Sequence, residues 1–180
     1  GSEMCIRDSI RREASRLVNL IEDIIRLSQL DEGVAMPTEA VDILQLAEEV
    51  KSILRPSAEE RNVTVNLSGA GFSVTGVRRM LHEVVYNLCD NAIKYNVPGG
   101  RVNIHVEDRK LTVSDTGIGI PMEHQDRIFE RFYRVDKSHS KASGGTGLGL
   151  SIVKHAVAYH KAEIRLESTP GKGTAITIQF

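Results

Sequence analysis

Polar side chains in the stretch EVVYNLCDNAIKY, residues 83–95, have the spacing of one helix face. They recur at three- and four-residue steps, and they are Glu83, Asn87, Asp90, Asn91 and Lys94. Residues at such steps are neighbours on a helix surface. Two of them are amides, whose neutral oxygens suit a hard cation such as Mg2+. The alternative is an ordinary helix that exposes a polar face to water.

A second stretch, VSDTGIGIP, places an acid at the end of a strand-like pattern, directly before alternating glycines. The Asp115 carboxylate could accept a hydrogen bond from an exocyclic amine. Gly117 and Gly119 would let a planar base lie against the backbone, because glycine has no Cβ. The alternative is a capped turn in which Asp115 accepts from local N–H groups.

The glycine run GGTGLGLSIVKHA, residues 144–156, leads into an apolar helix pattern. It is not a P-loop, because Leu150 rather than Lys follows Gly149. It is not a dinucleotide fingerprint either, because its spacing differs and a long polar loop precedes it. Exposed N–H groups and a helix N-terminus nevertheless favour an anion. A flexible loop that begins a helix is the alternative.

A fourth stretch, IFERFYRV, residues 128–135, alternates aromatic and charged side chains. It is either an amphipathic helix end docked by its aromatics or a hydrophobic anchor for a mobile loop. In the second case its arginines could reach a phosphate, which guanidinium groups bind well.

The periodicity predicts the elements that must hold these residues. Helices are expected at 10–30, 43–61, 76–95 and 148–160, with a short one near 123–131 inside a long irregular stretch, 117–147. Strands are expected at 38–42 and 63–67, in a hairpin of 101–108 and 110–117 that turns at Asp108-Arg109, and in AEIRLES and GTAITIQF. Mixed helices and hairpins favour an α/β sandwich with a mixed sheet.

The first helix carries an apolar stripe that includes Ile10, Leu17, Ile21 and Ile24. It is too apolar to stand alone in water, so it needs a partner. The rest of this chain, a second copy or a missing helix would each serve.

Composition narrows the function classes. The chain has 180 residues, 41% of them hydrophobic, and a net charge of -1, which argues against a general nucleic-acid-binding surface. Cys5 and Cys89 lack metal-ligand spacing and indicate a reducing compartment. No signal peptide or membrane-length apolar run is visible. The leading Gly1-Ser2 looks like a tag remnant, so we expect a piece of a longer protein.

These motifs, in this order, resemble the ATP-binding domain of sensor histidine kinases, within the GHKL ATPase superfamily. NLCDNAIKY resembles the N box, DTGIGIP the first glycine box, FERFYRVD the F box, GGTGLGLSIV the second glycine box, and TPGKGTAITI the closing element. The stretch FYRVDKSHSKASGGTGLGLSIVKH is especially similar to the phosphate-responsive, PhoR-type sensor kinases of Gram-positive bacteria. RLVNLIEDIIRLSQLDEG resembles the second helix of the dimerisation and histidine-phosphotransfer hairpin. The resemblance therefore assigns residues 1–33 to that hairpin and 34–180 to the ATP-binding domain.

The resemblance implies a two-layer α/β sandwich, the GHKL or Bergerat fold, with ATP under a lid. Asp115 would accept from the adenine amino group while Gly117 and Gly119 pass close to the base. Asn91, with Asn87, would hold Mg2+. Nucleotide contacts would also come from Lys94, Tyr95, Gly145, Thr146, Gly147, Leu148, Gly149 and Thr174.

By the same resemblance, Phe129 and Phe132 would pin the lid and Arg134 would steer the γ-phosphate. Glu83 would be either a catalytic base or a structural ion-pair partner. The implied partners are ATP, a second protomer bound through the hairpin, and a response regulator, with no nucleic acid. The domain would be cytoplasmic, and the full-length protein would be anchored in the membrane.

The six histidines lack the setting of a phospho-acceptor. His82 is followed by Glu83, but Val84 and Val85 come next, inside the N box. We therefore expect the acceptor histidine to lie upstream of this chain. Two alternatives are a GHKL ATP hydrolase, although gyrase and heat-shock chaperones lack the F box and hairpin helix, and an ATP-binding scaffold without turnover.

Overall fold

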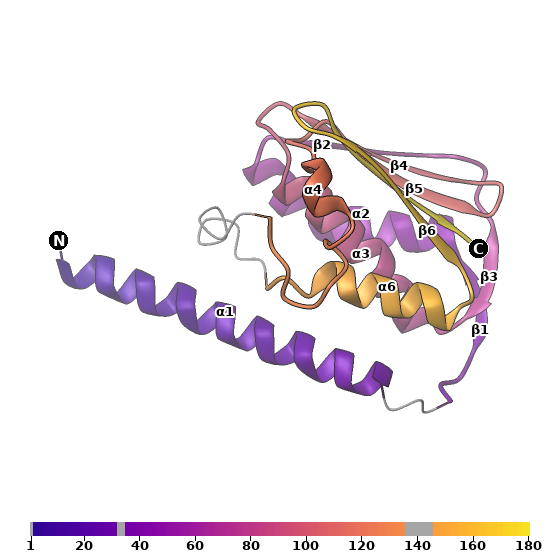
Figure 1. The fold of residues 1–180 in the computed structure, drawn as a ribbon, viewed down its shortest axis with the longest axis horizontal. Coiled ribbons are helices and arrows are strands. Elements are labelled where there is room, and N and C mark those ends of the chain that lie inside the picture. Colours follow the sequence, from indigo (N-terminus) through magenta and orange to yellow (C-terminus); the bar gives the residue numbers. More distant parts are fainter. Residues whose placement is uncertain (1, 32–34, 136–145) are drawn as a thin grey trace.

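The computed structural model describes residues 2–31, 35–135 and 146–180, and it contains a helical layer packed on a mixed sheet (Figure 1). The five-stranded sheet has the order β2-β4-β5-β7-β6. Its strands are β2 (Thr64–Ser68), β4 (Arg101–Glu107), β5 (Lys110–Asp115), β7 (Gly173–Gln179) and β6 (Glu163–Thr169). β2 pairs with β4 in parallel, and the other neighbours are antiparallel. The expected α/β sandwich with a mixed sheet is thus confirmed.

The β4–β5 hairpin turns at Asp108 and Arg109, as the sequence predicts. Both residues have positive φ, 52° and 59°, and Glu107 pairs with Lys110 across the turn. Two successive left-handed residues match the right-handed twist of the strands that they join. This turn sets the register of β4 and β5, which places Asp115 at the far end of β5, opposite Val102 of β4. On its other side Asp115 pairs with Thr174 of β7.

Three helices cover one face of the sheet: α2 (Ile43–Glu60), α3 (Arg78–Lys94) and α6 (Gly149–Tyr159) (Figure 1). Each buries an apolar stripe in a shared aliphatic core, which includes Leu46, Leu81, Leu88 and Val153. Asp42 caps α2 by accepting the N–H of Gln45 at 3.0 Å. The core leaves the opposite, polar edge of α3 free to line a site.

The predicted bounds of two helices were wrong. A short strand, β3 (Ser73–Gly76), pairs with β1 (Glu39–Asp42), so α3 begins at Arg78 rather than at Gly76. The helix expected near 123–131 is only α4 (Met122–Gln125). Beyond it the backbone forms successive turns as far as Tyr133, in which an N–H donates to the carbonyl oxygen three residues earlier.

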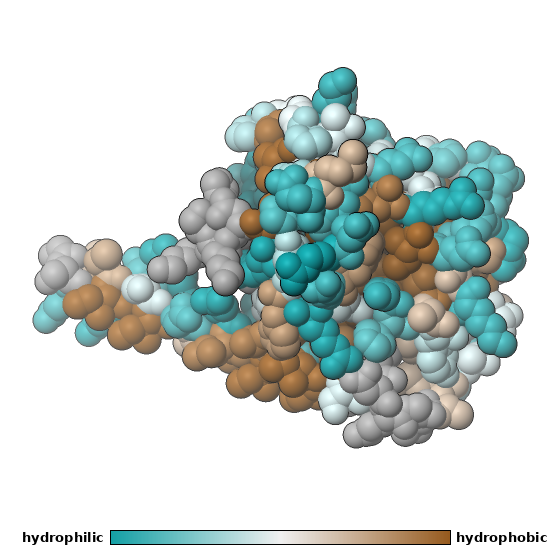
Figure 2. Space-filling model, viewed as in Figure 1, coloured by the Kyte–Doolittle hydropathy of each residue, from teal (hydrophilic) through white to brown (hydrophobic). Residues whose placement is uncertain are grey.

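The first helix, α1 (Ser2–Asp31), begins earlier than predicted and extends away from the sandwich (Figure 1). Near its C-terminal end it docks on α6: Leu27 is buried with Leu148 and Ile152, and Leu20 packs against them. The rest of its apolar stripe is exposed, and Figure 2 shows apolar side chains gathered along its outer edge. Within the described ranges, no helix combines the length and apolarity that a membrane span needs.

Candidate nucleotide-binding site

One cavity of about 480 Å³ lies between α3, the end of β5, the start of α6 and one side of α1. The polar row predicted on α3 faces it without exception: Glu83, Asn87, Asp90, Asn91 and Lys94. The same cavity is lined by Tyr95, Asp115, Gly119, Arg134, Thr146, Gly147, Gly149 and Thr174. Stretches far apart in the sequence therefore meet at one place.

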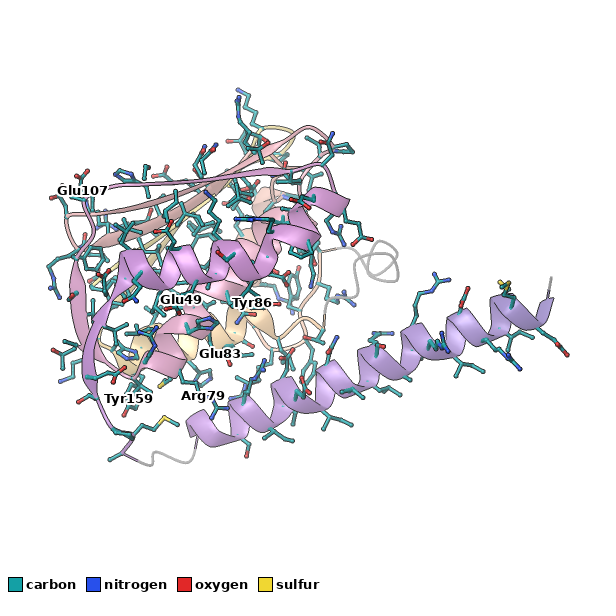
Figure 3. The ribbon with its side chains drawn as sticks, turned by 180° about the vertical axis from the view of Figure 1, so that it is seen from behind. Glu49, Arg79, Glu83, Tyr86, Glu107 and Tyr159 are labelled. Carbon is teal, nitrogen blue, oxygen red and sulfur yellow. The ribbon has the colours of Figure 1, made fainter. Side chains whose placement is uncertain are left out.

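The α3 row is tied together by short polar contacts. Lys94 Nζ lies 2.8 Å from Asp90 Oδ2, and the Asn87 side-chain amide donates to the carbonyl oxygen of Glu83 at 2.7 Å. Since this bond uses the Asn87 nitrogen, the Oδ1 atom is oriented as an acceptor or ligand. Glu83 lies on the side of α3 that faces α1, and its Oε1 is 3.2 Å from Arg26 Nε (Figure 3).

Asp115 is held at the other end of the cavity by backbone groups. Its Oδ1 accepts the N–H of Gly117 at 2.8 Å and that of Thr174 at 3.3 Å. Burial raises the pKa of the Asp115 carboxyl above its ordinary value, and these two hydrogen bonds oppose the rise. The capped turn considered from the sequence is thus present, and the same carboxylate still lines the cavity.

Glycines make room at both ends. A Cβ on Gly117 would lie 2.3 Å from the carbonyl oxygen of Tyr95. A Cβ on Gly149 would lie 3.0 Å from Asn87 Oδ1, so any side chain there would crowd the amide. The start of α6 is therefore kept open where it faces α3.

The aromatic stretch meets the second glycine run through its backbone. Phe132 has a φ of 63°, and its N–H donates to the carbonyl oxygen of Gly147 at 2.9 Å. Arg134 lines the cavity, and its Nη2 atom is buried with no hydrogen-bond partner in the part of the chain described. A buried cationic donor without an acceptor is costly, which points to an anion from outside the chain.

The remaining predicted residues lie around the cavity rather than in its wall. Gly117 donates its N–H to Asp115, and Leu148 is fully buried beneath α1, against Leu27. Phe129 lines a separate groove beside α6, and the Phe132 side chain is largely exposed. Gly145 lies outside the described residues.

Sequence reasoning missed several wall residues. Apolar ones are Val113, Ile120, Ile128 and Ile176, whose strand and turn patterns indicated only a core. Tyr86 and His82, with stacked rings, extend the wall along α3. Burial raises the pKa of the Tyr86 hydroxyl, and the Asp90 carboxylate raises it further. α1 adds Asn19, Glu22, Asp23 and Arg26, which no local pattern could place here.

A helical layer on a mixed sheet, with one cavity that is lined by a half-buried acid, a row of amides, cationic side chains and glycines, defines an ATP-binding domain of the GHKL class. Residues 76–180 match the family model of histidine kinase-, DNA gyrase B- and HSP90-like ATPases, and the chain belongs to this family. The resemblance seen in the sequence motifs is therefore confirmed.

The similar proteins are sensor kinases. The chain is 39% identical over 186 residues to the sensor-like histidine kinase SenX3 of Mycolicibacterium smegmatis, covering 96% of this chain and 48% of SenX3. It is 36% identical to the phosphate regulon sensor protein PhoR of Pseudomonas aeruginosa, covering 95% of this chain and 40% of PhoR. It thus spans less than half the length of either relative.

Among solved structures, the mycobacterial sensor histidine kinase MprB superimposes with a TM-score of 0.66 at 31% sequence identity. The match covers 79% of this chain and 95% of that structure. The fold of this neighbour and the matched family agree with the α/β sandwich of this chain.

Proposed function

We propose that this chain is the catalytic part of a sensor kinase, which binds ATP with Mg2+ and transfers the γ-phosphate to a histidine outside the chain. One observation carries the proposal: a single cavity joins the half-buried Asp115 carboxylate to Arg134, whose buried Nη2 has no hydrogen-bond partner among the described residues. An adenine amine fits the first group and a phosphate fits the second.

At the adenine end, Asp115 acts through a fixed acceptor. Both backbone donors bind its Oδ1, so Oδ2 is the oxygen to which an adenine amino group would donate. Val113, Ile120 and Ile176 supply apolar surface for the flat base, and Gly119 and Thr174 complete this part of the wall. Removing such a buried, charge-assisted acceptor costs about 2–5 kcal/mol.

At the phosphate end, positive charge and N–H groups gather. Lys94 and Arg134 supply cations, while Thr146, Gly147 and Gly149 bring the N-terminal end of α6 to the cavity. The partial positive charge of a helix N-terminus favours a phosphate there. Gly145 and Leu148 belong to the same cradle in this proposal, and Phe129 and Phe132 secure the segment that carries Arg134.

The donor set fits Mg2+ bound through the nucleotide. No cluster of three or more His, Cys, Asp or Glu side chains suitable for a metal occurs in the described ranges. Asn91 and Asn87 line the cavity, and Asn87 Oδ1 lies beside the start of α6, where a Cβ on Gly149 would be 3.0 Å away. Amide oxygens are hard ligands that accept Mg2+ together with phosphate oxygens. Bound Mg2+ would withdraw charge from the phosphates.

Phosphoryl transfer needs positioning and neutralisation of charge more than covalent help. Lys94 and Arg134 would neutralise the triphosphate, and the rigid α3 face would orient it. Glu83 is ion-paired with Arg26 in this structure, so a role as base requires that contact to open.

The larger protein is part of the proposal. Residues 1–33, which include α1, belong to the second half of a dimerisation hairpin that pairs with a second protomer, and residues 34–180 belong to the ATP-binding domain. A response regulator receives the phosphate, and the whole protein is anchored in a membrane. The relatives' names, sensor kinases in each case, support this assignment.

Labelled ATP tests the reaction. The chain alone should bind ATP in calorimetric titration yet form no acid-labile phosphohistidine. A separately purified dimerisation hairpin from a related sensor kinase should become labelled when it is added, and Asp115→Asn should abolish that labelling. Release of inorganic phosphate at the same rate with and without the hairpin would instead indicate an ATP hydrolase.

A further inference from the structure

Helix α1 contributes a polar face to the cavity. Asn19, Glu22, Asp23 and Arg26 recur at three- and four-residue steps, which places them on one side of the helix, and each of them lines the cavity wall. The proposed ATP site is therefore built partly by a helix outside the sandwich.

Asp23 occupies a place suited to a phosphate. Its Oδ2 accepts a hydrogen bond from Thr146 Oγ1 at 2.6 Å, and Thr146 Oγ1 in turn accepts the N–H of Leu148 at 3.4 Å. These two residues lead directly into α6, whose N-terminal end carries partial positive charge. The carboxylate of Asp23 is thus an anion at the glycine run that would otherwise receive the nucleotide.

Arg26 is already engaged by two acids. Its Nε lies 3.2 Å from Glu83 Oε1, and its Nη1 lies 3.5 Å from Asp23 Oδ1. The other charged residue that α1 brings to the cavity is Glu22, another acid. The α1 side of the wall is therefore net negative, which opposes a triphosphate.

The apolar contact between α1 and α6 links the position of α1 to the conformation of the glycine run. Leu27 packs on Leu148 and Ile152, and Leu148 lies between Gly147 and Gly149. A rearrangement of this run around phosphates would disturb the surface on which Leu27 rests. Docking of α1 and the conformation of the phosphate cradle are consequently linked.

We propose that Asp23 is an internal substitute for a nucleotide phosphate, so that docked α1 and a bound triphosphate compete for the start of α6. This inference rests on the proposed function, since it requires the cavity to bind a nucleoside triphosphate. Binding of ATP releases Asp23 from Thr146 and loosens α1. By thermodynamic linkage, docked α1 weakens ATP binding by the same factor.

Calorimetric titration of the whole chain with adenosine, ADP and MgATP tests the competition. Asp23→Asn keeps the size and an acceptor oxygen but removes the charge, and it should tighten MgATP binding about fivefold or more, ADP less, and adenosine not at all. Glu13→Gln is the matched control, because Glu13 is an exposed α1 acid that pairs with Arg16 outside the cavity. It should change none of the three affinities.

The outcomes separate the two claims. Unchanged or weaker MgATP binding by Asp23→Asn, with normal binding by the wild type, overturns the competition and leaves the proposed function standing. Absence of nucleotide binding in every variant overturns the proposed function and the competition with it.

Hydrogen exchange gives an independent readout. Amides of residues 20–27 should exchange faster in the wild type when MgATP is added, because α1 loosens. Slower exchange in this segment would mean that nucleotide and α1 support each other, and it would overturn the inference.

Discussion

The Oδ1 atom of Asp115 accepts the backbone N–H of Gly117 at 2.8 Å, and a Cβ on Gly117 would lie 2.8 Å from that same oxygen. Because glycine has no Cβ, Gly117 can bring its N–H to the Asp115 carboxylate without crowding it. The contact fixes the acid in a half-buried position where its charge is poorly solvated, and burial raises its pKa.

Asp115→Asn should therefore separate binding from stability. The amide oxygen can still accept from Gly117 and Thr174, so we expect the fold to persist. It loses the charge that would hold the adenine amine, so ATP binding should weaken about tenfold or more, which corresponds to roughly 1.4 kcal/mol per decade. Calorimetric titration measures this, and an unchanged affinity would remove Asp115 from the site.

The same substitution should alter how stability depends on pH. At low pH the carboxyl is protonated in both the folded and the unfolded chain, so its raised pKa costs nothing. As pH rises through the raised value, the unfolded chain releases the proton first and the wild type loses stability. Asn cannot ionise and escapes this loss. The melting temperature of Asp115→Asn minus that of the wild type should therefore become larger between about pH 4 and about pH 7. A constant difference would contradict the burial penalty.

Asn91→Ala tests the cation site. Asn91 lines the cavity on the α3 row, and the proposed function makes its amide oxygen a ligand of Mg2+. Its removal should therefore weaken the Mg2+ dependence of ATP binding and leave adenosine binding nearly unchanged. Titration of MgCl2 at fixed ATP measures this. Asn103→Ala is the control, since Asn103 is exposed on β4, outside the cavity lining, and its side-chain oxygen accepts a hydrogen bond from Asn66 at 3.2 Å. Identical Mg2+ titrations of Asn91→Ala and wild type would refute the role.

Gly76 and His160 form a second fitted pair, far from the cavity. His160 Nε2 accepts the N–H of Val77 at 3.0 Å, and a Cβ on Gly76 would lie 2.5 Å from that nitrogen. Gly76→Ala should displace the ring and destabilise the protein by about 1–3 kcal/mol in urea unfolding. In a chain that already carries His160→Ala, the methyl added by Gly76→Ala meets no ring. The double variant Gly76→Ala/His160→Ala should therefore be little less stable than His160→Ala alone. Additive losses would show that the contact is unimportant.

Secondary structure and the facing of side chains are predicted well from the sequence where they follow from a local hydrophobic period. The steps between Glu83 and Lys94 place the polar row on one face, because α3 must turn its apolar residues to the sheet. The Asp108-Arg109 turn follows from the two strand patterns that flank it. Asp115 reaches the cavity because β5 ends there.

The predictions fail where contacts between residues far apart in the sequence determine the structure. β3 is too short to carry a pattern and exists because it pairs with β1. The turns after α4 end with Phe132 in a left-handed conformation, bonded to Gly147, a partner distant in sequence. The pairing of Arg26 with Glu83 depends on how α1 docks on α6, and the pattern of either helix alone does not specify it.

The exposed stripe of α1 should make this chain self-associate. Docking on α6 covers Leu27, while Leu17, Val18, Ile21 and Ile25 remain 52–56% exposed. Burial of each such side chain contributes roughly 1.5–3 kcal/mol, so several together can pair two copies through α1. We expect sedimentation velocity to show a dimer that forms as concentration rises, and Ile21→Asn to shift the chain toward monomer. Val97→Asn, an exposed apolar residue in the turn after α3, should leave the association unchanged. A chain that stays monomeric at every concentration, or an Ile21→Asn variant that associates as the wild type does, would show that α1 is not the contact between copies.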